Sequence, residues 1–303
     1  MTATPMQTAA VRAEPGARPR DDELDLFGLT HPGKVRKENQ DHFLLATVHP
    51  QMVVHGTSLP DLEHLPLRGT RLATVMLVAD GVGSGSAGGA ASRLAVESIT
   101  RYVSSTMRCY HAAGSSGDVE LQEALRTAAL EAHDAVRAEA IAKAQAEGRT
   151  DPKGMATTLT LALAIWPWVY TLQVGDSRCY HYSYSDGTLH QVTHDQTLAQ
   201  GLVDDGVLPA ERLASSPFSH VLSSAIGAEA ATPVVTRIDI RRGCVILLCS
   251  DGLTKHVTDQ EINEECRAME SSEQLCHTLL DRALSAGGSD NITVIAARAR
   301  GMG

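Results

Sequence analysis

The spacing of apolar residues along the chain changes several times, and each change marks an expected element. Apolar runs predict strands over residues 24–31, 41–49 and 71–79. Apolar residues then recur every three or four positions, which predicts amphipathic helices over residues 87–106 and 118–147. The first half of the chain therefore begins with strands and continues into a pair of long helices.

The period returns to two in "TTLTLALAIWPWVYTLQVGDSRCYHYSYSDGTLHQVT", which predicts strands joined by hairpin turns at Trp-Pro-Trp and Asp186-Gly187. Residues 195–232 lose the strand pattern and predict a helical insertion. "CVILLCSDG" and "NITVIAARA" predict two more buried strands. Between them, "SSEQ" from Ser271 to Gln274 matches a capping box and predicts the start of a helix.

Helix pairs that alternate with runs of hairpin strands favour an α+β fold of antiparallel sheets covered by helices, not βαβ alternation. We find no linker or repeat after residue 23, so we expect one domain over residues 23–300 with its insertion at about 195–232. Residues 1–22 are rich in Pro, Ala and Arg and predict a disordered tail.

Composition removes several classes of function. The formal net charge of −10 argues against a nucleic-acid partner, because neutralising phosphates requires a basic surface. No run of 18 apolar residues occurs, so we expect no membrane span. Six scattered cysteines without a C-x-x-C pair suit a reducing cytosol, and we expect a cytoplasmic protein.

A glycine-rich loop follows the third predicted strand. Its residues 83–88, "GSGSAG", match the G-x-G-x-x-G pattern of dinucleotide-binding loops. That fold needs a second parallel strand soon after the first helix, whereas two helices follow here. Asp80 also ends the strand directly before the glycines, where a carboxylate would repel a pyrophosphate unless a cation intervened. We therefore reject dinucleotide binding.

Acidic residues recur at the ends of the predicted buried strands: Asp41, Asp80, Asp176, Asp251 and Asp290. A single such residue is ordinary at a turn. Five of them can converge on one edge of stacked sheets, where they would repel one another and need a multivalent cation. Ligands that are all oxygen select Mg²⁺ or Mn²⁺ over zinc. Two such ions can activate a bridging water and bind a phosphoryl group.

Six segments in this order, "VRKENQD", "DGVG", "MATTLT", "VGDSR", "CSDGLT" and "DNITVI", resemble the motifs of the PP2C (PPM) family of metal-dependent serine/threonine phosphatases. The resemblance covers roughly residues 24–298. It implies a four-layer αββα sandwich, in which two antiparallel sheets are flanked by helix pairs. It also implies hydrolysis of phosphoserine and phosphothreonine in proteins by a water that bridges two Mn²⁺ or Mg²⁺ ions.

The resemblance also implies roles for individual residues. Asp41 and Asp80 resemble the carboxylates around the bridging water, and the carbonyl group of Gly81 resembles a metal ligand. Arg36 resembles the arginine that binds the substrate phosphate, since a guanidinium can bind two phosphate oxygens at once.

The remaining ligands follow in the same way. Asp251 and Asp290 resemble the ligands of one ion of the pair, and Asp176 resembles the ligand of a third, weaker ion seen in bacterial members. Asn291 is expected to orient its loop. The chain departs from the family at Val82, where eukaryotic members carry a histidine assigned as general acid, and at Gln40, where glutamate is common.

Three interpretations remain at this stage: an active phosphatase, a pseudophosphatase-like module that binds phosphoproteins, and a structural sandwich that binds cations. The expected partners of a phosphatase are phosphoprotein substrates and a serine/threonine kinase acting in trans, and we expect a monomer. The insertion at 195–232 occupies the position of the family's variable flap, so we expect it to govern substrate choice. None of the histidines has metal-ligand spacing, and His31, His133, His194 and His220 are interpreted as incidental.

Overall fold

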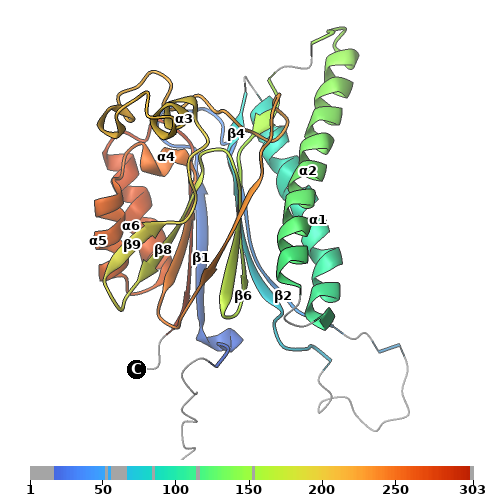
Figure 1. The fold of residues 1–303 in the computed structure, drawn as a ribbon, viewed down its shortest axis with the longest axis vertical. Helices are drawn as coiled ribbons and strands as arrows, with labels where there is room; N and C mark the ends of the chain where they lie inside the picture. Colours follow the sequence, from blue (N-terminus) through green and yellow to red (C-terminus); the bar gives the residue numbers. More distant parts are fainter. Residues whose placement is uncertain are drawn as a thin grey trace, which may run out of the picture.

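The structure is a computed structural model that describes residues 17–51, 54–55, 67–83, 86–113, 117–151 and 154–300. Its strands form two antiparallel sheets stacked face to face, with helices on both outer faces (Figure 1). The expected αββα sandwich is therefore confirmed.

Each main sheet has five strands, and neighbouring strands are antiparallel throughout. The first sheet, in spatial order, contains β1 (Leu24–His31), β12 (Ile292–Ala299), β11 (Val245–Cys249), β8 (Arg178–Ser183) and β9 (Thr188–Gln191). The second contains β10 (Val234–Asp239), β7 (Trp168–Val174), β6 (Leu159–Ile165), β3 (Ala73–Ala79) and β2 (His42–Val48). A short ribbon pairs β4 (Gly81–Val82) with β5 (Ala156–Thr157). Because all these strand pairs are antiparallel, the sheets of the described residues contain no parallel βαβ unit of the kind that a dinucleotide-binding fold requires.

The helices form the two outer layers. The second sheet is covered by α1 (Ala87–Ala113) and α2 (Asp118–Ala146), and the first by α4 (Asp251–Thr254), α5 (Asp259–Ala268) and α6 (Ser272–Ser285). The insertion contains α3 (Leu198–Asp204) and the 3₁₀ turn η3 (Ala210–Arg212). In the described ranges, no helix combines the length and apolarity needed to cross a membrane. α1 continues past the predicted end near residue 106.

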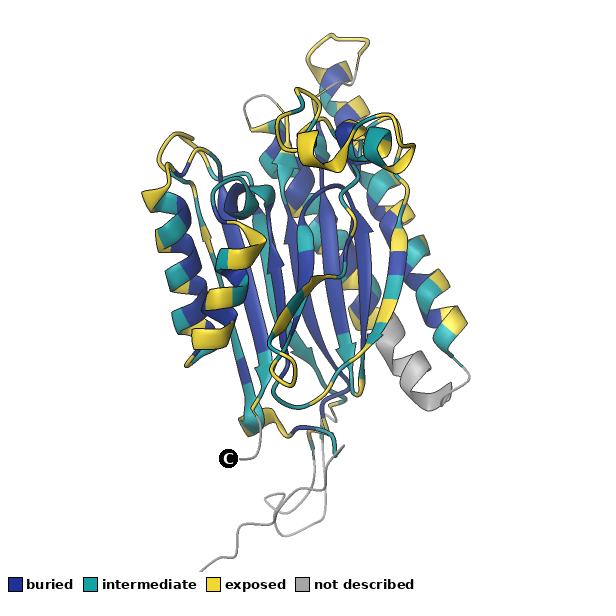
Figure 2. Cartoon of the chain, turned by 60° about the vertical axis from the view of Figure 1, so that its left-hand side comes forward, coloured by how far each residue is buried: buried dark blue, intermediate teal, exposed yellow. Residues whose placement is uncertain are grey.

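Strand β3 shows how the core is built. Val75 and Leu77 point into the cluster shared with α1 and α2, while Met76 and Val78 point into the cluster between the sheets, where they join Ile295. Because successive side chains of a strand face opposite sides, a strand covered on both faces needs a continuous apolar run. Figure 2 shows the resulting buried layer through the centre of the molecule.

The predicted capping box at Ser271 needs correction. Ser271 caps α6 as expected, since its side chain accepts a hydrogen bond from the backbone of Gln274. The side chain of Gln274, however, accepts from the backbone of Glu270, so the reciprocal half of the predicted box is displaced by one residue. A complete box occurs at the start of α5, between Thr258 and Glu261.

The ordered chain begins before residue 23, the boundary that composition predicted. A short 3₁₀ turn, η1, spans Asp21–Glu23, and the buried Arg71 side chain donates to the carbonyl oxygen of Pro19 at 2.7 Å and pairs with Asp21 at 2.6 Å. The rest of the predicted tail, residues 1–16, lies outside the described residues. The single-domain boundary at 23–300 stays a prediction.

The strand register brings distant acidic residues to one edge of the sandwich. His42 pairs with Ala79, so the flanking Asp41 and Asp80 lie at the same end of the second sheet. Cys249 pairs with Val294 in the first sheet, which places Asp251 and Asp290 at the corresponding end. This edge is the upper one in Figure 1, near α4 and β4.

Candidate metal and phosphate site

The predicted acidic residues converge on a cleft of about 1280 Å³ at this edge. Asp80, Asp176, Asp251 and Asp290 line the cleft, and so does Arg36. Asp41 is buried behind them with only 3% of its surface exposed. Residues from five separate strand ends thus form one site, as the sequence predicts.

Asp41 is held by hydroxyl groups of the opposite sheet. Its Oδ2 accepts hydrogen bonds from Ser250 Oγ and Thr293 Oγ1, both at 2.7 Å. Its Oδ1 is buried without a hydrogen-bond partner in the described structure. Burial raises the pKa of Asp41 to about 6. One oxygen is therefore fixed in place while the other remains available to a ligand.

The backbone of Asp80 is fixed by the "TT" segment before β6. Thr158 Oγ1 accepts from Asp80 N at 3.0 Å, and Thr157 Oγ1 donates to the carbonyl oxygen of Asp80 at 2.8 Å. The hydroxyl of Thr158 also lies 2.7 Å from that of Ser177, which follows Asp176. The two acidic loops are thus joined through threonine and serine hydroxyls.

Burial and neighbouring charge both oppose ionisation of these two acids. Burial, followed by the charge of Asp41, raises the pKa of Asp80 well above its usual value. Burial, followed by the charge of Asp251, raises the pKa of Asp176 to about 8.

Two glycines at the rejected nucleotide pattern, Gly81 before it and Gly88 at its end, serve close packing. A Cβ atom at Gly81 would collide with the backbone of Gly88, and one at Gly88 would lie 2.7 Å from Gln40 Oε1. Their lack of side chains lets the start of α1 approach β4 and lets Gly81 line the cleft. Ser84 and Gly85, the middle of the pattern, lie outside the described residues.

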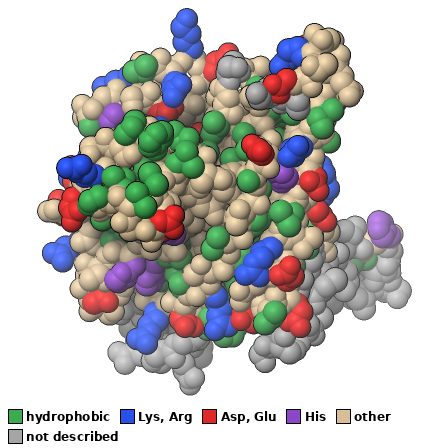
Figure 3. All heavy atoms as spheres, turned by 45° about the horizontal axis from the view of Figure 1, so that its top comes forward, with side chains coloured by type: hydrophobic (Ala, Val, Ile, Leu, Met, Phe, Trp, Pro, Cys, Tyr) green, Lys and Arg blue, Asp and Glu red, His purple; other side chains and the backbone are tan. Residues whose placement is uncertain are grey.

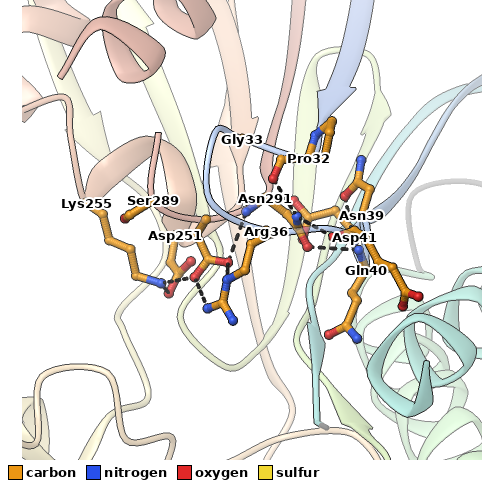
Figure 4. A network of polar contacts seen from close by, with 12 residues as sticks. Pro32, Gly33, Arg36, Asn39, Gln40, Asp41, Asp251, Lys255, Ser289 and Asn291 are labelled. Atoms are coloured by element: carbon orange, nitrogen blue, oxygen red, sulfur yellow. Dashed lines mark hydrogen bonds and ion pairs between the residues drawn. The ribbon is translucent and has the colours of Figure 1, made fainter. Parts of the chain in front are cut away.

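Two cations balance the acids on one side of the cleft (Figure 4). Arg36 binds Asp290 through Nε, 2.8 Å from Oδ1, and through Nη2, 3.0 Å from Oδ2. Lys255 Nζ lies 2.6 Å from Asp251 Oδ2 and 2.7 Å from Asp290 Oδ2. Sequence analysis did not identify Lys255, although its position four residues after Asp251, at the end of a helical turn, could have indicated this ion pair.

These contacts also set the protonation of the groups involved. Burial raises the pKa of Asp290, but hydrogen bonds from Lys255 and Arg36 lower it by more than burial raises it. The pKa of Asp290 is therefore below its usual value. Burial lowers the pKa of Lys255, and the charge of Asp251 more than reverses this effect. Lys255 and Asp290 are therefore both charged at neutral pH.

Asn291 orients the loop that carries Arg36. Its Oδ1 accepts from Gln40 N at 2.9 Å, and its Nδ2 donates to the carbonyl oxygens of Pro32 and Glu38 at 3.0 and 2.9 Å. These three bonds fix both ends of the turn between β1 and β2. Asn291 thus has an orienting role, and the loop that its side chain holds is the Arg36 loop.

The opposite wall of the cleft is the flap, residues 195–232. Its base is fixed by Arg178, whose Nη2 lies 2.7 Å from Asp195 Oδ2. Leu198, Val221 and His220 line the cleft, so His220 is closer to the site than its sequence context indicated. The flap also exposes Val207 and Phe218. Figure 3 shows hydrophobic side chains gathered on the part of the surface that carries the flap.

Comparison with known proteins identifies the family. A family model described as "Protein phosphatase 2C" matches residues 67–287. The chain belongs to the protein phosphatase 2C family.

Individual relatives agree with this family. The chain is 36% identical over 225 residues to serine/threonine protein phosphatase PstP of Mycobacterium tuberculosis, covering 74% of this chain and 40% of that protein. It therefore spans about two fifths of the length of that relative. It is 31% identical over 222 residues to serine/threonine phosphatase Stp of Listeria welshimeri, covering 73% of this chain and 82% of that protein.

A solved structure shares the fold. The crystal structure of the PstP catalytic domain, in complex with two manganese ions, matches with a TM-score of 0.66 and 28% identity. The match covers 92% of this chain and 99% of that structure. The sandwich expected from the sequence is therefore that of known phosphatase 2C structures.

The donor groups of the cleft suit hard divalent ions. The acidic residues supply only oxygen, which favours Mg²⁺ or Mn²⁺. Asp251 Oδ1, like Asp41 Oδ1, is buried without a hydrogen-bond partner among the described residues. No three His, Cys, Asp or Glu side chains of the described ranges are already arranged around one point, and Asp251 and Asp290 each give an oxygen to Lys255. The residues therefore fit a pair of divalent metal ions, although the coordination shell of these ions is not fully preformed.

The raised pKa values predict how stability depends on pH without metal. An Asp of raised folded pKa binds more protons folded than unfolded, so its contribution to stability falls as pH rises from about 4 to the folded pKa. Asp176, at about 8, still loses its proton between pH 6.5 and 8, where aspartates and glutamates of ordinary pKa are already ionised. We expect the melting temperature in chelator to fall from pH 6.5 to 8, and Mn²⁺ to raise it more at pH 8 than at pH 6.5.

The matched control is Asp176→Asn, which cannot ionise and should flatten the decline between pH 6.5 and 8. Thermal unfolding of both proteins with EDTA and with Mn²⁺ measures the difference. A wild-type melting temperature that rises with pH relative to the variant would contradict the assigned burial of this charge.

Proposed function

We propose that the chain hydrolyses phosphoserine and phosphothreonine in proteins, using two Mn²⁺ or Mg²⁺ ions bound at the acidic edge of the sandwich. The observation that carries this proposal is the convergence of five aspartates beside an exposed guanidinium, with two buried carboxylate oxygens left unpartnered. Family membership supports the reaction class, and the manganese ions of the PstP catalytic domain support the cofactor.

The ions, when bound, would activate a water nucleophile and neutralise charge on the phosphoryl group. We assign Asp41, Asp80 and the carbonyl group of Gly81 as one set of direct ligands, here called the inner ligands. Asp251 and Asp290 are assigned as direct ligands of one ion and are called the outer ligands. The hydroxyls of Ser250 and Thr293 hold Asp41 through Oδ2, which would leave Oδ1 available as a metal ligand. Asp176 is assigned to a third, weaker ion.

Arg36 is assigned to the substrate phosphate. Its side chain is 57% exposed and lines the cleft, and two of its five N–H donors bind Asp290. This pairing holds the planar guanidinium at the rim of the acidic cluster. A phosphate there could be bound by two parallel N–H groups, which lysine cannot supply.

The size of the cleft supports a protein substrate. A volume of about 1280 Å³ exceeds that of typical small-molecule pockets, about 300–1,000 Å³. The acidic edge would receive the phosphorylated side chain, and the apolar wall formed by Leu198 and Val221 would contact neighbouring residues of the substrate. We assign substrate choice to the flap for this reason. A kinase acting in trans and a monomeric state remain predictions.

The dependence on metal separates hydrolysis from the alternative of a pseudophosphatase-like binding module. We expect hydrolysis of p-nitrophenyl phosphate to require Mn²⁺ or Mg²⁺ and to stop in chelator. Asp251→Asn should lower turnover by more than about a hundredfold. Loss of a residue that only hydrogen-bonds to a metal ligand costs about 10–100-fold, and loss of a direct ligand should cost more. Asp281→Asn, which removes an exposed carboxylate on α6, serves as the matched control and should behave as wild type. Metal-independent turnover, or a fully active Asp251→Asn, would rule out the dinuclear mechanism.

Arg36→Ala tests phosphate binding. We expect a fall in kcat/KM that corresponds to a loss of about 2–4 kcal/mol of transition-state stabilisation. The melting temperature should change little, because exposed ion pairs contribute only about 0–1 kcal/mol. Lys34→Ala, an exposed neighbour on the same loop, is the control. A large loss of stability with unchanged kinetics in the folded fraction would instead assign Arg36 to a structural ion pair.

The glycine loop has no histidine to supply the proton for the leaving serine alkoxide, because Val82 stands in the cleft wall where eukaryotic members carry that residue. His42 bonds to Ser92 Oγ at 2.9 Å and His194 to Asp204 at 2.8 Å, and neither lines the cleft. His220 does line the cleft and is tested below. We propose that water supplies this proton.

Two measurements test this proposal. His42→Ala and His194→Ala should each keep phosphoserine-peptide turnover within about threefold, under 1 kcal/mol of barrier. Val82→His should change the peptide rate more than the p-nitrophenyl phosphate rate, because p-nitrophenolate leaves without a proton. A hundredfold loss confined to the peptide in either alanine variant, or in His220→Ala, would identify that histidine as the acid.

A further inference from the structure

The ammonium group of Lys255 lies between two carboxylates assigned to the same ion. Its Nζ is 2.6 Å from Asp251 Oδ2 and 2.7 Å from Asp290 Oδ2, and its side chain is only 19% exposed. Figure 4 shows it reaching from α4 toward Asp251 and the Arg36 loop. The contact is therefore an interior one, and it differs from the exposed ion pairs that contribute little to a fold.

The fold fixes this lysine in place. The backbone N–H of Lys255 donates to the carbonyl oxygen of Asp251 at 2.8 Å, so one helical turn sets the two side chains on the same face. Asp290 arrives from the other side, at the start of β12. The ammonium thus bridges two partly buried carboxylates from separate segments that would otherwise repel each other.

The positive charge is unevenly distributed over the site. In the described part of the chain, the ion pairs with the acidic cluster come from Lys255 and Arg36, and both involve Asp290. The described lysines and arginines form no ion pair with Asp41 or Asp80, and Asp41 Oδ1 is unpartnered. The inner ligands are therefore open to a cation, whereas the outer ligands already have one.

A divalent ion at the outer ligands would meet this lysine directly. Mg²⁺, for example, binds carboxylate oxygens at about 2.0–2.1 Å. The Lys255 ammonium already contacts one oxygen of each carboxylate at hydrogen-bond distance. The two cations must share lone pairs or repel each other across a short distance. Either effect lowers the affinity of the ion.

We propose that Lys255 is a built-in counter-ion that holds Asp251 and Asp290 together in the metal-free protein and weakens binding of the ion on their side. The two ions then bind unequally, the one at Asp41 and Asp80 being the tighter. This inference rests on the proposed function, since it takes these aspartates as ligands.

Mn²⁺ titration of the metal-free protein, by calorimetry and by electron paramagnetic resonance of free Mn²⁺, tests the proposal. Lys255→Met removes the charge with little change in length and should tighten the weaker site by about tenfold or more, because a like charge next to the ion is lost. The same variant should melt at a lower temperature than wild type in chelator. Lys255→Arg keeps the charge, and Lys34→Met removes an exposed charge on the same edge; neither should tighten the weaker site.

Three other results would overturn the proposal. Identical Mn²⁺ affinities and identical metal-free melting temperatures in wild type and Lys255→Met would show that Lys255 is not a counter-ion. Unchanged Mn²⁺ affinity with weaker binding of inorganic phosphate would make it a phosphate ligand. If no Mn²⁺ binds to any of the proteins, the proposed metal centre itself is wrong. Lys255→Gln serves as the second neutral variant if Lys255→Met does not fold.

Discussion

Repulsion among five aspartates at one edge of two stacked sheets is the constraint on which the rest of the site depends. The antiparallel register forces it: the partners His42 and Ala79 bring Asp41 beside Asp80, and the pairing of β11 with β12 brings Asp251 to the Asp290 loop. Burial then removes the water that would screen these charges. Protons or cations must compensate them, and the polar residues around the edge hold the carboxylates where cations can reach them.

The surrounding hydrogen bonds divide this task between the two sheets. Thr293 lies in β12 of the first sheet and Ser250 directly follows β11 of that sheet, yet both hold Asp41 at the start of a strand of the second sheet. Within the second sheet, Thr158 links the backbone of Asp80 to Ser177. Because the Ser250 and Thr293 hydroxyls are on short side chains, they cannot follow a moving Asp41 carboxylate. The positions of the Asp41 side chain and of the Asp80 backbone are therefore preorganised by the same packing that stabilises the sandwich.

The sequence predicts the architecture well because period-two apolar runs and acidic strand ends are local signals. It cannot predict contacts that depend on register. Thr293 reads as an ordinary strand residue, and Ser250 as a turn residue, until β11 and β12 are aligned. Lys255 was missed although its spacing from Asp251 is local, because nothing in the chain shows that Asp290 completes the bridge. The ordered segment before residue 23 depends likewise on a distant residue, Arg71.

Formal charge connects this arrangement to phosphate binding. Fully ionised, the five aspartates together with Arg36 and Lys255 carry a charge of −3. One divalent ion leaves the site at −1, which still repels a phosphate dianion, whereas two ions bring it to +1 and attract it. In the proposed metal centre, with all five aspartates ionised, the cleft would therefore attract substrate only once a second ion is bound. Since Lys255 contacts an oxygen of Asp251 and of Asp290, our inference on Lys255 would link substrate binding to the release of these two carboxylates by the lysine.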